Sequence, residues 1–459
     1  MRQGDDGVAR QIDIVSNEDG SKPSNPQDDA LPLKVLVSAF WFSPTRGSEC
    51  GVGWNYVKAI AARHRVWVIT RTDEREDTEQ YLREVPEALL NIRIHYLSMT
   101  DKKFRFPIRQ VVYARIYEEW QRRACQMARD LDSEIQFDLI HQLNGIGFRE
   151  PGYLWTLGKP FVWGPVGGLQ YFPLRLIGAV PFRSRPFFVL KNLSTALAMY
   201  SSQRPRRAAI SAGAIFAATE NVAEKIRRVW RREATVLCEV TPPAVERKLP
   251  ARREPGQPMK IVWSGFCEPR KALNIVLLAL RRLLRSPADW HLTVVGDGPL
   301  LKAWSTLAER IGIGARCTFL GGVSRAEVQA IMAQSHCLVQ PSLYDATTTV
   351  LVEAQVHGLP VICLDHFGFA DAVDATCGVK IPVGPLRQVV QQFAAAIESL
   401  AMDENLRYEM AMAAQDAVSR ASIEHKGAVL NKIYSKVLRV EDPDEGEQSG
   451  GSPPAPPLH

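Results

Sequence analysis

Two series of short apolar runs, separated by a polar segment, constrain the fold of this chain more than any other feature. The first series lies at residues 33–40, 65–71, 91–97, 137–143, 160–165, 214–219 and 234–240, and the second at 260–266, 290–296, 317–322, 336–342, 360–365 and 378–383. Each run is nearly continuously apolar, and helix-like segments separate the runs, a pattern typical of parallel strands covered by helices on both faces. The sequence therefore predicts an α/β fold with two Rossmann-like, doubly wound parallel sheets that face a cleft.

The chain has 459 residues, which exceeds what one hydrophobic core usually covers, so two domains are expected. The Pro-rich segment ERKLPARREPGQP indicates a linker between them. We predict an N-terminal domain at 33–248, a C-terminal domain at 258–415, and a helix at 416–440 that returns to the first domain. The segments 1–32 and 441–459 are poor in apolar residues, so both are expected to be disordered tails.

Cysteine usage and the absence of targeting signals favour a cytoplasmic protein. The N-terminal segment has no apolar core, so no signal peptide is expected, and no stretch reaches the roughly 18 uninterrupted apolar residues of a membrane span. The eight cysteines include no Cys-x-x-Cys pair, and several lie in apolar runs, as expected of reduced thiols. Neither the histidines nor the acids have metal-ligand spacing, so no metal is expected.

The segment PSLYDATTTVLVEAQVHGLPV, residues 341–361, follows a predicted strand and contains two carboxylates. VLVEAQVHG predicts a helix that ends at Gly358. A helix start exposes unpaired N–H groups, so it can hold a phosphate oxygen with hydroxyl donors from Thr347, Thr348 and Thr349. Glu353 lies one turn after Thr349 and can bind a ribose diol, and Asp345 can bind a sugar ring. The alternative is that Asp345 caps the helix and Glu353 is a solvated charge.

Polar and glycine-rich loops follow other predicted strands, where ligands of doubly wound sheets bind. SPTRGSECGVGW, residues 43–54, permits close backbone approach, and it supplies Gly47 and Ser48 as donor-binding candidates. In the second domain, Arg270 and Lys271 precede a helix, and such cations make charge-assisted contacts with a diphosphate. Alone, this pair is more typical of a solvated helix start.

The acceptor side is expected in the N-terminal domain. His141 ends a predicted strand, and Asn144 and Glu150 follow in the next loop. Together with Arg46 and Glu49, these two loop residues are acceptor-side candidates. The alternative for His141 is a hydrogen-bonded structural residue.

The second half resembles the family 4 retaining glycosyltransferases. The pattern P-S-L-x-D, seven residues, E-A-x-x-x-G-L-P-V-I is similar to that family's E-x7-E signature, with Asp345 at the first Glu and Ala346 and Thr347 in its G-F-G loop. The segment around Lys271 resembles its G-R-x-x-x-x-K-G diphosphate loop, with Phe266 at the Arg position and Ala272 at the last Gly. GDGP (296–299) and FLGGV (319–323) match loops that line the nucleotide base. GSECGVGW and GPVGG (164–168) resemble a bacterial polysaccharide-building branch.

This resemblance implies a GT-B fold and a retaining hexosyltransferase that uses a nucleoside diphosphate sugar as co-substrate, without another cofactor. Glu353 would bind the ribose, Asp345 the sugar hydroxyls, and Arg270 and Lys271 the diphosphate. The acceptor would be a glycan or lipid-linked saccharide. Related enzymes carry a His at the strand of His141, near the reacting sugar and acceptor, so the resemblance also makes His141 a catalytic candidate. The resemblance also implies that four positions line the donor: Gly265, Gly296, Gly298 and Val323.

Two segments mix cations with large apolar residues, at 102–123 and 175–207, which suits an anionic membrane surface on the cytoplasmic face of the inner membrane. An ordinary amphipathic helix is the alternative. No nucleic-acid module accompanies the charge. Two rival functions remain open: a nucleotide-sugar epimerase of the same architecture, and a non-catalytic nucleotide-sugar-binding subunit.

Overall fold

The computed structural model describes residues 31–47, 49–99, 109–143, 145, 147–242, 248–345 and 349–439. The predicted tails lie almost wholly outside these ranges, as do four candidate site residues: Ser48, Asn144, Thr347 and Thr348.

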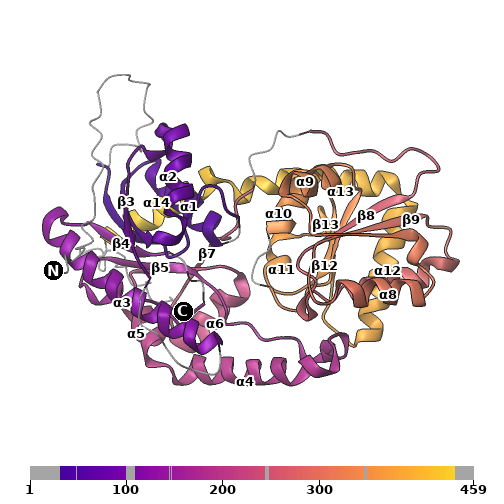
Figure 1. The fold of residues 1–459 in the computed structure, drawn as a ribbon, viewed down its shortest axis with the longest axis horizontal. Coiled ribbons are helices and arrows are strands. Elements are labelled where there is room, and N and C mark those ends of the chain that lie inside the picture. Colours follow the sequence, from indigo (N-terminus) through magenta and orange to yellow (C-terminus); the bar gives the residue numbers. More distant parts are fainter. Residues whose placement is uncertain are drawn as a thin grey trace, which may run out of the picture.

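The N-terminal domain is a parallel sheet covered by helices on both faces (Figure 1). Its seven strands have the order β3-β2-β1-β4-β5-β6-β7, and β1 pairs in parallel with both β2 and β4. The strand-forming segments are buried apolar runs, which explains why the sequence pattern located them. The elements are β1 (Lys34–Ser38), α1 (Glu49–Ala61), β2 (Arg65–Arg71), α2 (Arg75–Glu84), β3 (Ile92–Leu97), α3 (Arg109–Ile135), β4 (Leu139–Gln142), β5 (Phe161–Val166), α4 (Arg185–Ser201), α5 (Gln203–Ser211), β6 (Ala214–Ala217), α6 (Glu220–Trp230) and β7 (Thr235–Val236).

The C-terminal domain repeats this architecture with six parallel strands in the order β10-β9-β8-β11-β12-β13. Its elements are β8 (Met259–Ser264), α7 (Leu273–Arg282), β9 (Trp290–Val295), α8 (Leu301–Arg310), β10 (Cys317–Gly321), α9 (Arg325–Ala333), β11 (Cys337–Gln340), α10 (Thr349–Val356), β12 (Val361–Leu364), α11 (Gly368–Ala372), β13 (Gly378–Ile381), α12 (Leu386–Met402), α13 (Glu404–Ala417) and α14 (Ile423–Arg439). Short 3-10 helices are η1 (Thr72–Glu74), η2 (Pro86–Leu89), η3 (Leu154–Thr156), η4 (Leu174–Ala179), η5 (Phe182–Ser184), η6 (Pro269–Lys271), η7 (Leu283–Arg285), η8 (Gly314–Arg316) and η9 (Val418–Ala421).

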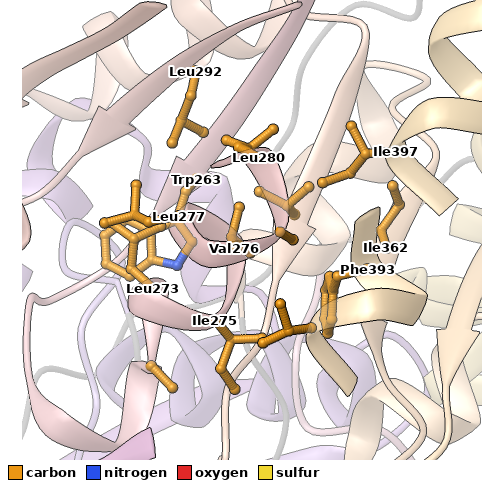
Figure 2. Packing of buried hydrophobic residues seen from close by; sticks show 14 of the residues in the cluster. Trp263, Leu273, Ile275, Val276, Leu277, Leu280, Leu292, Ile362, Phe393 and Ile397 are labelled. Atoms are coloured by element: carbon orange, nitrogen blue, oxygen red, sulfur yellow. The ribbon is translucent and has the colours of Figure 1, made fainter. Parts of the chain in front are cut away.

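The core of the C-terminal domain lies where α7 and α12 cover one face of the sheet. Figure 2 shows side chains of α7 between Trp263 and Leu292 of the sheet and Phe393 and Ile397 of α12. All four of these side chains are fully buried. This packing holds β8 and the loop that follows it, which belongs to the candidate site.

Two segments cross from one domain to the other. Residues from Phe172 to Phe188 belong to the N-terminal sequence range, yet Phe172, Leu176 and Phe188 pack in the core of the C-terminal domain. In the opposite direction, α14 places Leu430 and Tyr434 in the core beside β1 and α1. The domains are thus joined by packed elements in addition to the linker, and this packing fixes the faces that meet at the site.

Candidate functional site

Each sheet has a point where the strand order reverses, between β1 and β4 in the first sheet and between β8 and β11 in the second. Loops at the carboxyl ends of such strands diverge and leave room for a ligand. The candidate residues of both domains lie in these loops or at the helix starts that follow them. The site is therefore built from two switch points.

The loops after β8 and β9 pack against each other through glycine backbones. A Cβ atom added to Gly296, which has φ +133°, would lie 1.8 Å from the carbonyl oxygen of Gly265. A Cβ atom on Gly298 would lie 2.7 Å from the carbonyl oxygen of Cys267. Only glycine permits this approach. Val323, after β10, is half-buried and packs against a neighbouring core cluster.

A buried ion cluster joins the loop after β8 to the loop after β11. Lys271 Nζ lies 2.8 Å from Asp345 Oδ2, and Arg270 Nη1 donates a hydrogen bond to Asp345 Oδ1. Arg270 also donates to the Tyr344 carbonyl oxygen at 3.0 Å and contacts Glu268 at 2.6 Å. Asp345 and Lys271 are each less than a tenth exposed. Each oxygen of Asp345 thus contacts a cation, so in this geometry the carboxylate positions both cations.

The N-terminal domain adds two cations that sequence reasoning missed as site residues. Lys191 of α4 lies 3.7 Å above the ring of Tyr344, and its pKa is lowered by burial and then by the charges of Arg270 and Arg149. Burial raises the pKa of Tyr344, and the positive charge of Arg149 opposes that shift. One sequence signal could have identified Lys191 as a site residue: it is the one charged residue between Arg185 and Arg204.

The charges around Tyr344 do not cancel. Four cations lie there (Arg149, Lys191, Arg270 and Lys271) with two carboxylates (Glu268 and Asp345), giving a net charge of 4 − 2 = +2. Such a cluster beside partly buried surface attracts a dianionic group strongly, because screening by solvent is weak there.

Glu353 lies on α10 and is largely buried. Burial raises the pKa of its carboxyl group, and Arg325, whose Nη2 lies 3.6 Å from Oε1, opposes that shift. Its carboxylate therefore lies next to the start of α9, which follows β10. Thr349 begins α10 and is exposed, and Gly358 follows that helix with φ +66°, as a helix-ending glycine does.

A cavity of about 610 Å³ lies between the domains. Aromatic side chains of the N-terminal domain form much of its wall, and α4 and the donor-side Tyr344 complete it. The lining residues are Trp41, Tyr113, Tyr117, Gly145, Gly147, Phe148, Arg149, Glu150, Gly168, Phe187, Leu190, Lys191, Ser194, Thr195 and Tyr344. Because Lys191 and Tyr344 belong to both the cavity wall and the cation cluster, the cavity opens onto that cluster.

Two carboxylates near the cavity differ in their partners. Glu150 lines it and is hydrogen-bonded to Arg204. Glu49, at the start of α1, has a buried Oε2 atom with no hydrogen-bond partner, and burial raises the pKa of its carboxyl group to about 7. Burial raises the pKa of Tyr113 and Tyr117, which line the cavity, and the charge of Glu49 adds to both shifts.

The contacts of the other N-terminal candidates do not indicate ligand binding. Arg46 is half exposed and forms an ion pair with Asp77 at 2.8 Å, and Gly47 is exposed with no atom near its Cβ position. His141 is fully buried, its Nδ1 lies 2.6 Å from the Tyr434 hydroxyl, and its Nε2 lies 2.7 Å from the Gly164 carbonyl oxygen. Burial lowers the pKa of His141 to about 4. With both nitrogens used inside the core, this geometry favours the structural alternative for His141 over a catalytic role.

The described part of the chain contains no group of three or more His, Cys, Asp or Glu side chains arranged to hold a metal ion. Within the same residues, every helix is too short or too polar to span a bilayer.

Comparisons with known proteins agree with this geometry. Residues 245–417 match the family described as Glycosyl transferases group 1. Alpha-D-kanosaminyltransferase of Streptomyces kanamyceticus is 26% identical over 39% of this chain and 45% of its own length. The chain spans about half the length of the curated relatives it matches.

Solved structures match across both domains. Sucrose-phosphate synthase from Thermosynechococcus elongatus has a TM-score of 0.60 at 15% identity, covering 89% of this chain and 100% of that one. HepE of Anabaena in complex with UDP has a TM-score of 0.56 at 16% identity, covering 88% and 99%. The predicted GT-B fold of two parallel-sheet domains is confirmed.

Proposed function

We propose that this protein is a retaining hexosyltransferase that moves a sugar from a nucleoside diphosphate sugar to a glycan or lipid-linked saccharide. The observation that carries the proposal is the cluster of four cations around Tyr344, which has a net charge of +2 and opens onto the interdomain cavity. We further propose a role in surface or exopolysaccharide assembly, on the resemblance of its glycine loops to that branch.

The cation cluster suits the diphosphate of the donor. Arg270 and Lys271 would contact the phosphates, with Lys191 approaching from the other domain, and Asp345 would keep the first two in place and contact a sugar hydroxyl. As the bond from the sugar C1 to the diphosphate breaks, charge grows on the leaving oxygen, and preorganised cations stabilise it. The cations supply this charge themselves, so the proposal requires no metal ion.

The nucleoside end would lie toward α10. Glu353 would accept hydrogen bonds from the ribose hydroxyls, and the glycine loops after β8 and β9 would approach the base and phosphates closely. The start of α10 at Thr349 would supply N–H groups that have no acceptor within the helix. HepE, which has a similar fold, was solved in complex with UDP, and this supports a nucleotide as the ligand.

The acceptor would occupy the aromatic cavity. Its attacking hydroxyl forms a bond to C1 on the face that the diphosphate leaves, and its proton passes to the departing phosphate oxygen, which balances the transfer. Aromatic walls suit the apolar faces of sugar rings. Glu150, which lines the cavity, would accept a hydrogen bond from an acceptor hydroxyl.

The epimerase alternative is not favoured, because the matched family and relatives are transferases. A binding subunit differs from a transferase in leaving the donor intact. We propose a location in the cytoplasm, against the cytoplasmic face of the inner membrane. The exposed apolar side chains of α4 support contact with a membrane surface.

A donor panel tests the proposal. Purified protein would be titrated with UDP, GDP, ADP and their common sugar conjugates, followed by thermal shift, and release of free nucleoside diphosphate would then be measured. One nucleotide class should bind, and Glu353→Ala should weaken turnover at least tenfold, about 1.4 kcal/mol. Glu409→Ala, an exposed glutamate on α13, is the matched control. Absence of a shift with every compound would contradict the proposal.

A further inference from the structure

Helix α4 exposes an apolar stripe along most of its length. Six large side chains on it are about half or more exposed, at fractions from 47% to 70%: Phe187, Val189, Leu190, Leu193, Leu197 and Tyr200. Phe188, Thr195 and Met199, on the other side of the helix, are at most 5% exposed. Their spacing of three and four residues places the exposed side chains on one face. We call these six residues the α4 stripe.

The stripe is held rigidly at the edge of the molecule. Phe188, near the start of α4, packs in the core of the C-terminal domain, and Met199, near its end, packs in the core of the N-terminal domain. Figure 1 shows α4 running along the lower edge, below both domains. A helix anchored at both ends presents its outer face as a fixed surface.

The segment that carries the stripe has charges of a single sign. Residues 151–219 include eight lysines and arginines and no aspartate or glutamate. Four of the arginines are exposed next to α4 in sequence, Arg175, Arg183, Arg206 and Arg207, whereas Arg204 is paired with acidic residues of other segments. An exposed apolar surface of this kind marks an interaction site, and the exposed arginines that flank it in sequence favour an anionic partner.

We propose that α4 lies flat on an anionic lipid bilayer, with the α4 stripe among the acyl chains near the headgroups and the flanking arginines against lipid phosphates. The helix has the features of an interfacial element: an apolar face, an opposite face attached to the protein, and cations at the boundary. Its 17 residues span roughly 25 Å, long enough to lie along the surface with several side chains inserted.

A second copy of this chain fits the surface less well than a bilayer does. A twofold interface brings the same patch of each copy together, so the arginines around one stripe would face those of its partner. No acidic side chain between residues 151 and 219 is present to compensate them. An anionic bilayer provides both the apolar interior and the compensating charge.

Docking through α4 would also set the position of the cavity. Phe187 and Leu190 belong to the stripe and line the cavity, so the two surfaces are continuous. An acceptor with a lipid anchor would then place its saccharide in the cavity while its chain stays in the bilayer. This choice of acceptor rests on the proposed function, whereas the docking itself does not.

Vesicle sedimentation tests the docking without requiring turnover. The full chain would be incubated with vesicles of phosphatidylcholine containing about a third phosphatidylglycerol, and with phosphatidylcholine vesicles alone. The variant Leu193→Gln/Leu197→Gln changes two stripe residues that do not line the cavity. The matched control, Leu90→Gln/Leu249→Gln, changes two exposed leucines on other segments.

The wild type and the control should bind the anionic vesicles at least tenfold more strongly than the neutral ones, with the difference reduced at high salt. The stripe variant should bind at least tenfold more weakly than the control. Equal binding of the two variants, or no preference for anionic lipid, would overturn the proposal. A concentration-dependent dimer in analytical ultracentrifugation that only the stripe variant loses would also overturn it, in favour of a second copy. If vesicle binding fails while the protein still binds and turns over the donor, the docking proposal is wrong and the proposed function is not affected.

Discussion

The β1/β4 and β8/β11 switch points have the same strand arrangement and different contents. At β8/β11, loop residues Arg270, Lys271 and Asp345 form a buried ion cluster supported by glycine-to-backbone packing. At β1/β4, the neighbouring cavity has aromatic walls, and Glu49 keeps a buried oxygen without a hydrogen-bond partner. Strand order therefore determines where a ligand binds, and the loop side chains determine which chemistry it meets.

The family match follows the same division. It covers residues 245–417, which contain the ion cluster, and leaves the aromatic cavity's N-terminal walls outside. We interpret the C-terminal switch point as the donor side and the N-terminal one as the acceptor side. Variants at matched positions of the two loops test whether the two switch points differ in this way.

The largest effect is expected from Gly296→Ala. The new Cβ would lie 1.8 Å from the Gly265 carbonyl oxygen at a φ of +133°, so the two loops would have to separate. We expect a loss of about 3 kcal/mol in the free energy of unfolding, measured by urea denaturation. Gly47→Ala is the counterpart in the N-terminal loop, where no atom lies within 4 Å, and it should change that free energy by less than about 0.5 kcal/mol. Equal effects would mean that the two loops do not differ in packing.

Lys271→Ala should come next in size. It removes one of the two cations on Asp345 and, under the proposed function, a phosphate contact. We expect kcat/KM for the donor to fall roughly a hundredfold, about 2.7 kcal/mol. Lys302→Ala, an exposed lysine on α8, should leave it unchanged. Donor turnover by Lys271→Ala at the wild-type rate would remove this residue from the site.

A pH-dependent effect is expected from Glu49→Gln. The pKa of Glu49 is raised from 4.5 to about 7 in the folded protein, so the folded state binds its proton more tightly than the unfolded state does. Stability from this group is therefore present below pH 4.5 and lost as the pH rises through 7. Removing the carboxylate should make the variant about 3 kcal/mol more stable than the wild type at pH 8, relative to the difference at pH 4.5. Thermal unfolding across this pH range measures it.

The exposed Glu76→Gln on α2 serves as the control for Glu49→Gln, and its stability difference should not vary over the same pH range. A Glu49→Gln difference that is constant with pH would show that the carboxyl group is solvated, and the contrast between the two switch points would lose its N-terminal part.

The smallest expected effect is a gain in stability. Ala272 has left-handed angles, φ 47° and ψ 38°, at the position where the resembling family has glycine. Ala272→Gly should relieve this conformation and stabilise the protein by about 1 kcal/mol. Ala279→Gly, in the middle of α7, should instead destabilise it by about 1 kcal/mol, because glycine lowers helix stability there. Urea denaturation of both variants tests the opposite signs.

Much of the fold follows from local sequence pattern. All thirteen predicted strands overlap observed ones, because most are buried runs whose apolar side chains fill both faces of a sheet. The edge strands β3, β7 and β10 are only partly buried. The segment 341–361 was likewise informative, since a strand, a loop and a helix in sequence necessarily bring Asp345 and Glu353 to one end of the sheet. Those relations depend on neighbours in the chain.

The remaining features depend on contacts between distant segments. In α3, the aromatic residues Tyr117 and Trp120 of the basic segment 102–123 are buried, which favours the ordinary amphipathic helix there, while part of that segment lies outside the described residues. In segment 175–207, by contrast, the six large apolar side chains of the α4 stripe are exposed.

Local sequence pattern predicts the two parallel sheets, the linker and the loops that carry Arg270, Lys271 and Asp345. Three other features are visible only once the chain is folded: Lys191 contacts Tyr344 across the domains, His141 is enclosed by Tyr434 and Gly164, and one face of α4 is exposed. The two groups of features differ in the range of the interactions that produce them. Strand and helix patterns arise from the periodic burial of nearby residues, whereas the environment of a side chain depends on which remote elements pack against it.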